Sequence, residues 1–206
     1  MVFHRRTLLP LIVLALTLAR ATVMADAKFT SVWGAPEART ANFKGKKVAA
    51  LVISEDMSLR MSGEEALARE LTARGIEGTA AYRQIPAPEL KNPDAAKRWF
   101  DRDGVTGVVA LKPVSQDKVK RYTPDMWASP YYSTFWGYYP YSWSTVYVVG
   151  SAATDTVIVV ESLVYDIQSG KLIWAGVSET TNPKSLQKLV ADIVKEAAKK
   201  IEKQFR

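Results

Sequence analysis

Residues 155–179 have the sequence DTVIVVESLVYDIQSGKLIWAGVSE, and this stretch decides the fold. Val, Ile, Tyr and Trp dominate both of its arms, and such side chains favour β-strands. Ser169 and Gly170 stand where the chain reverses, and Gly170 is placed to take the left-handed conformation of a three-residue loop over 168–170. The stretch therefore predicts a β-hairpin.

Counting back from this loop predicts that Tyr165 faces Ile173 and that Val164 faces Trp174. The first arm carries apolar side chains on both of its faces: Val157, Val159, Leu163 and Tyr165 on one, and Ile158, Val160 and Val164 on the other. A strand that is apolar on both sides is usually central in its sheet and covered on both faces. We therefore expect this arm to form the middle of the sheet.

Five further segments are candidate strands, from their composition and length. They cover residues 30–33, 46–53, 76–83, 105–112 and 144–150. The first of them is expected at a sheet edge, and helical patterns separate the next three. Alternation of strand and helix predicts parallel pairing with right-handed crossovers, whereas the second half of the chain is antiparallel in character. The sequence thus predicts an α/β fold with a mixed sheet of five or six strands.

Two helices are expected within the first half of the chain. Ser62 and Glu65 match a capping box at the start of the first helix, and Gly75 ends it. Asn92 caps the second helix, with Pro93 at its first position.

A C-terminal amphipathic helix is the strongest helical pattern in the chain. Asn182 is expected to cap it, with Pro183 at the first position. Apolar residues recur along it at helical spacing: Leu186, Leu189, Val190, Ile193, Val194, Ala197, Ile201 and Phe205.

The N-terminus has the composition of a signal peptide over residues 1–27. A basic MVFHRR segment precedes an apolar core over 7–19, and Ala25-Asp26-Ala27 fits a cleavage site. The core is shorter than the roughly 20 residues of a membrane span, so an uncleaved anchor is the alternative. Cleavage leaves residues 28–206, the size of a single domain, and implies a periplasmic protein, free or peripherally associated with the outer membrane.

Cysteine and histidine are nearly absent from the chain. It has 0 Cys, and its 1 His is His4, inside the expected signal peptide. Cys- or His-based zinc sites, Ser-His-Asp triads and Cys-His dyads are thereby excluded from residues 28–206. We predict no catalytic residue, no metal site and no cofactor.

The charge balance is basic, with 28 Lys and Arg against 21 Asp and Glu. The excess is spread along the chain, with local clusters at residues 44–47 and 195–203. For an exported protein this favours acidic envelope surfaces over nucleic acid as partners, and a merely solvated basic surface is the simpler alternative. We expect no nucleic-acid partner.

The most unusual stretch is residues 125–144, DMWASPYYSTFWGYYPYSWS. Nine of its residues are aromatic: Trp127, Tyr131, Tyr132, Phe135, Trp136, Tyr138, Tyr139, Tyr141 and Trp143. Pro130, Gly137 and Pro140 interrupt any long strand or helix, so the stretch is expected to be a loop.

Three interpretations of this aromatic loop compete. Its rings could pack on each other and on the sheet, since aromatic groups bury large areas. They could dock a partner protein, a peptide or a cell-wall glycan, or they could contact a membrane interface. Our function hypothesis is a non-catalytic docking module of the envelope that uses all nine rings, and deleting residues 125–144 is then expected to leave the fold intact. The alternatives are a periplasmic protein that binds a glycan or small ligand and, third, a carboxylate-dependent hydrolase.

Carboxylates are the remaining acid–base groups. Glu161 is expected to face Val177 among apolar neighbours, where burial could raise its pKa and make it an acid. The simpler interpretation is that Glu161 marks the exposed end of the sheet or pairs with a lysine. No second carboxylate is placed opposite it, as glycoside hydrolysis would need.

Two further acidic positions have simple expected roles. Asp166 precedes the hairpin loop, where its oxygens can accept the N–H groups of the turn. Ser54-Glu55-Asp56 follows the first long strand, where α/β proteins often place ligands, but this segment lacks the glycines of a phosphate loop.

Several local motifs coincide with those of one family. They are Ser31-Val-Trp33 with Pro36, Phe43 before Lys47-Val-Ala-Ala-Leu-Val, Leu71-Thr-Ala-Arg74-Gly75, Tyr165 to Trp174, and Glu179-Thr-Thr-Asn182-Pro183. Together with the aromatic loop, they resemble a family of small bacterial envelope proteins of unknown function, many of which are described as lipoproteins. The resemblance implies this fold and an envelope location, and it implies no catalytic residue. This chain lacks the acylated cysteine of the lipoprotein members, which favours a soluble periplasmic protein over an anchored one.

Overall fold

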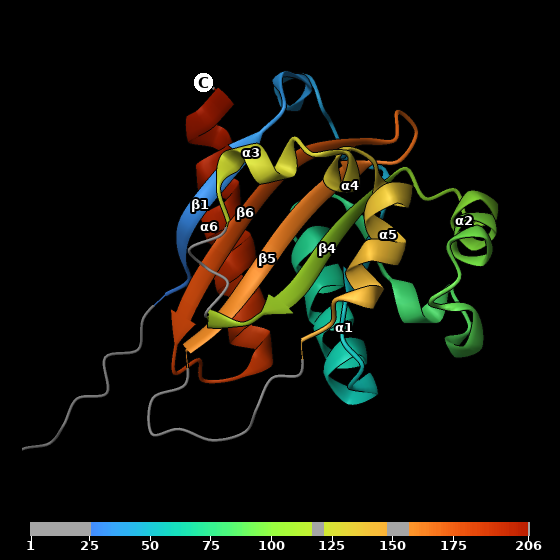
Figure 1. The fold of residues 1–206 in the computed structure, drawn as a ribbon, viewed down its shortest axis with the longest axis horizontal. Helices are drawn as coiled ribbons and strands as arrows, with labels where there is room; N and C mark the ends of the chain where they lie inside the picture. The colour runs from blue at the N-terminus through green and yellow to red at the C-terminus, as the bar shows by residue number, and fades with distance from the viewer. Residues whose placement is uncertain (1–25, 117–121, 148–156, 206) are drawn as a thin grey trace, which may run out of the picture.

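Six strands form one mixed sheet in the computed structural model, which describes residues 26–116, 122–147 and 157–205 (Figure 1). The strands are β1 (Lys28–Gly34), β2 (Lys47–Val52), β3 (Glu77–Ala80), β4 (Gly107–Val114), β5 (Val157–Asp166) and β6 (Lys171–Thr181). Their order across the sheet is β1-β6-β5-β4-β2-β3. The predicted α/β fold with a mixed sheet is confirmed, and so is the edge position of the first strand.

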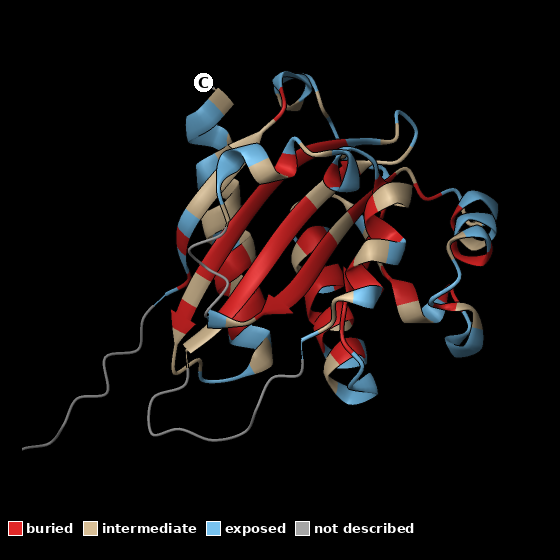
Figure 2. Cartoon of the chain, viewed as in Figure 1, coloured by how far each residue is buried: buried red, intermediate tan, exposed pale blue. Residues whose placement is uncertain are grey.

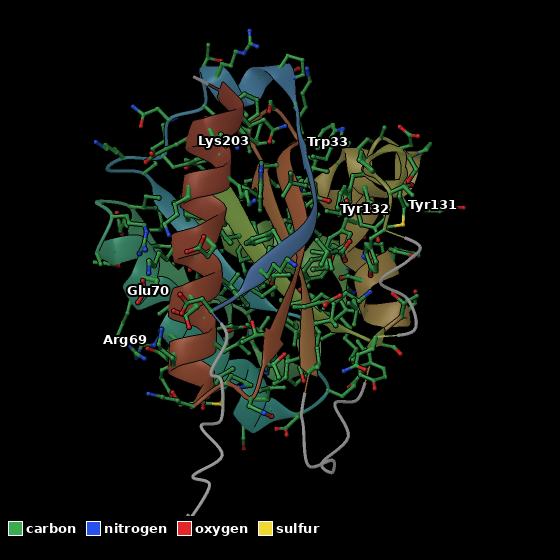
Figure 3. The ribbon with its side chains drawn as sticks, turned by 90° about the vertical axis from the view of Figure 1, so that its left-hand side faces the viewer. Trp33, Arg69, Glu70, Tyr131, Tyr132 and Lys203 are labelled. Atoms are coloured by element: carbon green, nitrogen blue, oxygen red, sulfur yellow. The ribbon has the colours of Figure 1, made fainter. Side chains whose placement is uncertain are left out.

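Helices cover both faces of the sheet (Figures 1 and 3). The helices are α1 (Met57–Thr72), α2 (Pro93–Arg102), α3 (Pro124–Trp127), α4 (Pro130–Ser133), α5 (Phe135–Ser144) and α6 (Leu186–Phe205), with 3-10 turns η1 (Pro36–Arg39), η2 (Ala81–Arg83) and η3 (Ala87–Glu89). Residues of α1 and α6 pack on one face, and residues of α2 to α5 pack on the other.

Strand pairing changes character halfway through the sheet. β2 pairs in parallel with both β3 and β4. The pairs β4–β5, β5–β6 and β6–β1 are antiparallel. The predicted parallel first half and antiparallel second half are therefore both confirmed.

The hairpin of β5 and β6 lies where the sequence predicted it. Val164 pairs with Trp174 as expected, but Tyr165 pairs with Leu172 and not with Ile173, because the register shifts at this point. Four residues, 167–170, connect the strands, and Gly170 takes the left-handed conformation with φ 73°. The Oδ1 atom of Asp166 accepts the N–H groups of Gln168 and Ser169, at 2.9 and 3.2 Å.

Two hydrophobic cores lie on opposite faces of the sheet. Figure 2 shows that the central strands between them are buried. In β5, Val159, Leu163 and Tyr165 belong to the core under α2 to α5. Val160 of the same strand belongs to the core under α1 and α6. The expected central position of β5, covered on both faces, is confirmed.

Helix α1 begins earlier than the sequence predicted. The Oδ1 atom of Asp56 accepts the N–H groups of Ser58 and Leu59, at 2.8 and 3.0 Å, and so caps the helix. Ser62 and Glu65 consequently lie inside α1, and the expected capping box is wrong.

Of the two other predicted helix caps, the one for α2 is confirmed and the one for α6 is wrong. Asn92 caps α2 by accepting the Ala95 N–H at 3.0 Å, as expected. Asn182 does not occupy the cap position of α6, and Pro183 is not its first residue, because the helix begins at Leu186. Ser185 takes that role, since its hydroxyl oxygen accepts the Lys188 N–H at 3.1 Å.

Two strand expectations were too long or wrong. The expected strand over 76–83 is reduced to β3, and η2 follows it directly because the chain turns after Ala80. Residues 144–147 form the end of α5 and a turn, not a strand, and residues 148–150 lie outside the described residues.

The expected signal peptide lies outside the described residues, except for Asp26 and Ala27. Among the residues that the structure describes, no helix combines the length and the apolar composition needed to cross a membrane.

Candidate functional site

The aromatic stretch 125–144 is helical, and the expected loop is wrong. Pro124 and Pro130 stand at the starts of α3 and α4, where a missing N–H costs nothing. The side chain of Thr134 accepts the Gly137 N–H at 3.1 Å and caps α5, which continues through Pro140. The residues that suggested interruptions therefore start helices or are tolerated inside one.

Most of the nine rings face the sheet. Six of them are buried: Trp127, Tyr132, Phe135, Tyr138, Tyr139 and Trp143. These rings form an aromatic layer over β5, where the rings of Phe135 and Tyr138 lie 5.4 and 5.8 Å from the ring centre of Tyr165. The Tyr165 hydroxyl donates to the Tyr132 carbonyl at 2.9 Å. These six rings belong to the core, so they cannot form an exposed docking surface in this structure.

Only the outer side of this helical layer is accessible. Tyr131 is 64% exposed, and Trp136 and Tyr141 are half-buried. Figure 3 shows Tyr131 at the outer edge of the layer, next to the more deeply placed Tyr132. The rings of Tyr131 and Tyr141 lie 5.6 Å apart, and Lys97 lies 5.9 Å from the ring of Trp136.

Glu161 lies beneath this layer and is 0% exposed, so the expectation that it marks an exposed end of the sheet is wrong. Its carboxylate accepts the Trp127 Nε1–H at 3.1 Å and the Tyr138 hydroxyl at 3.5 Å. Lys112 is its neighbour across the strands, and Val177 faces it on the other side, as expected. Burial raises the pKa of Glu161, while Trp127 and Lys112 oppose that rise.

Residues 54–56, which follow β2, make local hydrogen bonds and an ion pair, and they do not form the ligand site that the sequence suggested. Ser54 accepts the Asp56 N–H at 3.1 Å, and Asp56 caps α1. Glu55 is 2.6 Å from Lys91 in an exposed ion pair.

Sequence reasoning missed Glu64, which is 0% exposed at the ends of β2 and β3. Its two carboxylate oxygens accept the N–H groups of Val52 at 3.2 Å and Tyr82 at 2.7 Å. Burial raises its pKa to about 7, although these two hydrogen bonds and nearby Arg60 oppose the rise. In the sequence, Glu64 lies inside the expected helix, and nothing there predicts that its carboxylate accepts N–H groups at the ends of two strands.

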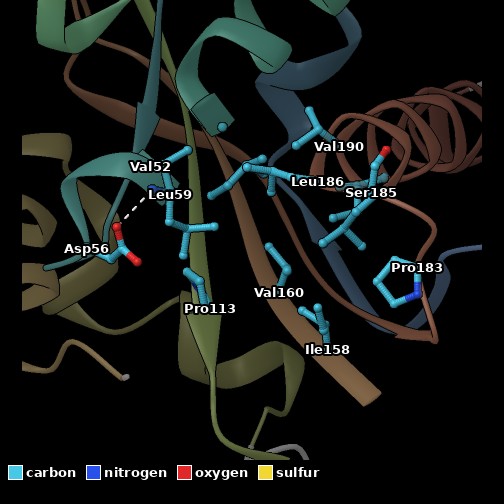
Figure 4. Close-up of a pocket in the computed structure, with 14 residues that line it drawn as sticks. Val52, Asp56, Leu59, Pro113, Ile158, Val160, Pro183, Ser185, Leu186 and Val190 are labelled. Carbon is cyan, nitrogen blue, oxygen red and sulfur yellow. Dashed lines mark hydrogen bonds between the residues drawn. The ribbon is translucent and has the colours of Figure 1, made fainter. Parts of the chain in front are cut away.

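A groove between α1, α6 and the sheet forms a cavity with a volume of about 370 Å³. It lies on the face of the sheet that α1 and α6 cover, near the carboxyl ends of β2 and β4, and Figure 4 shows its lining side chains. Its lining comes from five elements and their loops: Val52, Asp56, Leu59, Gly63, Leu111, Pro113, Ile158, Val160, Pro183, Ser185, Leu186, Leu189, Val190 and Ile193. We call this cavity the α1–α6 groove.

The lining of the α1–α6 groove is almost entirely aliphatic. Among the described residues that line it, Asp56 has the charged side chain and Ser185 has the hydroxyl group. Each of these side chains already caps a helix. Gly63 brings α1 close to β2, since a Cβ there would meet the Val52 side chain at 3.1 Å. The groove therefore offers hydrophobic contact and no arrangement for acid–base or nucleophilic chemistry.

No protein-family model matches the chain, and no curated protein matches it. Among solved structures, the chain is similar to the PelC dodecamer from Paraburkholderia phytofirmans, in a single-residue variant and in a second crystal form. The variant is 14% identical, with a TM-score of 0.43, over 82% of this chain and 96% of that chain. The second is 17% identical, with a TM-score of 0.40, over 82% and 90%. The likeness is distant, and we transfer no property of PelC to this chain.

Proposed function

We propose that this protein is an exported, periplasmic binding protein without catalytic activity, and that the α1–α6 groove holds an apolar chain. The observation that carries the proposal is the groove itself. Its volume of about 370 Å³ falls within the range of small-molecule sites, roughly 300–1,000 Å³. Leaving such an aliphatic surface in water costs about 25 cal/mol per Å², which a bound hydrocarbon would recover.

The chemistry of the lining selects the class of ligand. Val160, Leu186 and Val190 offer contacts to methylene groups, and the described interior residues provide no polar group that would orient a sugar or a nucleotide base. Exposed Lys184 stands in sequence between two lining residues, Pro183 and Ser185. An acyl chain matches this interior, and we propose that its anionic headgroup lies outside the groove, on the side of Lys184.

A displacement titration tests this proposal. The purified protein is loaded with a fluorescent fatty acid, which is then displaced with octanoate, laurate and palmitate. Leu186→Trp fills the groove, whereas Ile201→Trp places the same ring on the same helix at a half-buried position outside the groove lining. We expect saturable binding that Leu186→Trp weakens at least tenfold and Ile201→Trp leaves unchanged. Equal effects of the two variants, or no saturable binding, would refute the proposal.

Docking to an envelope protein or a cell-wall glycan is the second candidate function, now limited to the outer side of the aromatic layer. It is favoured by Tyr131, which is 64% exposed and whose ring centre lies 5.6 Å from that of Tyr141. Photocrosslinking from position 131 in cells tests it. The control carries the crosslinker at exposed Lys171 instead. A discrete protein or glycan adduct that forms from position 131 and not from position 171 supports docking, and absence of any adduct argues against it.

A further inference from the structure

Another cavity lies at one edge of the sheet, between α1 and the edge strand β3. Its volume is about 310 Å³. Its lining comes from α1, β3 and η2: Glu65, Ala68, Arg69, Thr72, Gly78, Thr79, Ala80 and Arg83. It shares no lining residue with the α1–α6 groove. We call this cavity the edge groove.

Strand β3 has one side that faces no other strand, because in the described part of the chain it pairs with β2 alone. The Glu77 N–H donates to the Lys46 carbonyl at 2.9 Å, on the side of β2. Backbone groups alternate in direction along a strand, so those of Gly78 and Ala80 point away from β2. The Gly78 N–H donates locally to the Ile76 carbonyl, at 2.8 Å. The Gly78 carbonyl and the Ala80 N–H therefore remain for a further strand.

Helix α1 lies directly against this edge. A Cβ at Gly78 would meet the Ala68 carbonyl oxygen at 2.3 Å, so the backbones of β3 and α1 approach closely there. Gly78 and Thr79 are half-buried, whereas Ala80 is 2% exposed. The accessible stretch of the edge is therefore short, and Ala80 closes one end of it.

Arg69 gives the edge groove a net positive charge. Its side chain is exposed, and within the described ranges it forms no ion pair. The acidic groups nearby are already matched: Glu65 lies 2.7 Å from Arg83, and Glu77 lies 3.5 Å from Lys47. An acidic side chain of a partner would thus meet an unpaired guanidinium, whose planar fork of N–H donors suits a carboxylate.

Exposed methionines extend this surface along α1. Met61 is 36% exposed and Met57 is 54% exposed, and they precede Glu65 by about one and two turns of the helix. Residues four apart lie on the same side of a helix, so both methionines lie on the side of Glu65. A partner that follows the edge groove past Glu65 would therefore meet an apolar surface after a polar one.

We propose that the edge groove binds an extended acidic segment of a partner protein, which lies along β3 as an additional strand. Its carboxylate pairs with Arg69, its backbone bonds to Gly78 and Ala80, and an apolar side chain at its end contacts Met61. Peptides often bind by adding a strand to a free sheet edge, where backbone bonds supply affinity and side chains supply specificity. The proposal depends neither on the α1–α6 groove nor on the aromatic layer.

An NMR titration of the isotope-labelled protein with the acetylated peptide Leu-Thr-Glu-Val-Glu-Thr-Leu tests the proposal. Leucine stands at both ends, so that either direction of the added strand brings one leucine towards Met61. We expect saturable shifts of the amide signals of Gly78, Thr79 and Ala80 and of the Met61 methyl signal. The same peptide with lysine in place of glutamate should bind about fivefold more weakly, as an exposed ion pair allows. Shifts confined to other residues, or equal binding of the two peptides, would overturn the proposal.

A charge reversal separates the edge groove from the general charge of the protein. Arg69→Glu should weaken binding of the acidic peptide about fivefold and strengthen binding of the lysine peptide. Arg39→Glu is the matched control, because Arg39 is also exposed and follows β1, at the opposite edge of the sheet. This control should leave both affinities unchanged. Equal effects of the two variants would show that the peptide does not pair with Arg69, and the proposal would fail.

Methylation of the peptide's backbone nitrogens tests the added strand. Alternate N–H groups of a strand point to opposite sides, so methylation at the two glutamates or at the two threonines blocks one side each. One of these peptides should lose binding and the other should keep it. If both bind or both fail, the peptide does not lie along β3 as a strand. Concentration-dependent shifts of the same amides without peptide would assign the edge groove to a second copy of this chain and would equally overturn the proposal.

Discussion

Glu64 ties α1 to the ends of two strands, and its environment makes it sensitive to pH. Its oxygens hold the N–H groups of Val52 and Tyr82, yet the side chain is completely buried. Burial raises its pKa from 4.5 to about 7 in the folded protein. The folded state therefore binds this proton more tightly than the unfolded state does.

The consequence is a loss of stability as the pH rises. The contribution of Glu64 to the free energy of unfolding should be largest below pH 4.5, fall between pH 4.5 and about 7, and be lower by about 3 kcal/mol above that window, on the basis of about 1.4 kcal/mol per pKa unit. Urea unfolding of the wild type and of Glu64→Gln across this range measures it. The variant should show a flatter profile, and parallel profiles would show that Glu64 does not titrate in this window.

Trp127 is expected to stabilise the fold by donating to the buried carboxylate of Glu161, at 3.1 Å. Trp127→Phe removes this donor and should cost about 1–3 kcal/mol, because a buried carboxylate loses a hydrogen bond that water cannot replace. Trp99 gives a matched control, since its Nε1–H donates to Glu89 at 2.9 Å and the Glu89 side chain is 41% exposed. Trp99→Phe should cost less in the same urea experiment, and equal losses would refute the argument.

At the scale of elements, the helices α3 to α5 act as a structural layer over the sheet. Phe135 is fully buried beside Tyr165, whereas Tyr131 is mostly exposed. Phe135→Ala should therefore cost about 3–5 kcal/mol of unfolding free energy, and Tyr131→Ala should change it by less than about 0.5 kcal/mol. Deleting residues 125–144 should abolish cooperative unfolding, which reverses the expectation from the sequence. A deletion variant that unfolds cooperatively would show that this layer is dispensable.

Local signals predicted some elements and missed others for identifiable reasons. The hairpin was predictable because its strands are adjacent in sequence and Gly170 fixes the turn. Helix α5 was missed because Gly137 and Pro140 suggested interruptions, although Phe135, Tyr138 and Tyr139 recur at helical spacing and point to one face. Burial of these rings on the sheet outweighs the low helix propensity of the two interrupting residues.

Two helix caps were predicted at the wrong residues. The pattern of Ser62 and Glu65 occurs inside α1, where the preceding Asp56 starts the helix earlier. Asn182 was expected to cap α6, but the helix begins at Leu186, and Ser185 takes that role. A cap depends on where the chain leaves the preceding strand, and one sequence does not contain that information.

At the scale of the whole molecule, the α1–α6 groove depends on residues that are far apart in the chain. It joins Val52, Leu111, Val160 and Leu186, and no sequence pattern predicts that these four residues come together. In β4, Leu111 lines the groove, whereas its neighbour Lys112 points to the opposite face, as alternate residues of a strand do. The alternation of side chains along β4 could be predicted from the sequence, but the groove between α1 and α6 could not.

Ligand binding in the α1–α6 groove should stabilise the whole fold. Laurate at one hundred times its Kd should add about 2.7 kcal/mol to the free energy of unfolding, provided that it does not bind the unfolded chain. For a chain of this size that corresponds to a rise in Tm of roughly 5–10 °C. Calorimetric melting with and without laurate measures it, and Leu186→Trp should show no rise. A rise of equal size in that variant would place the ligand elsewhere.

The most direct test of the account is an NMR measurement of contacts between laurate and the labelled methyl groups of Ile, Leu and Val. We predict nuclear Overhauser effects from the chain protons of laurate to Ile158, Val160 and Leu186, which line the α1–α6 groove. Contacts only with Leu163 or Val177, which belong to the opposite core, would contradict the account, as would the absence of any contact at saturating laurate.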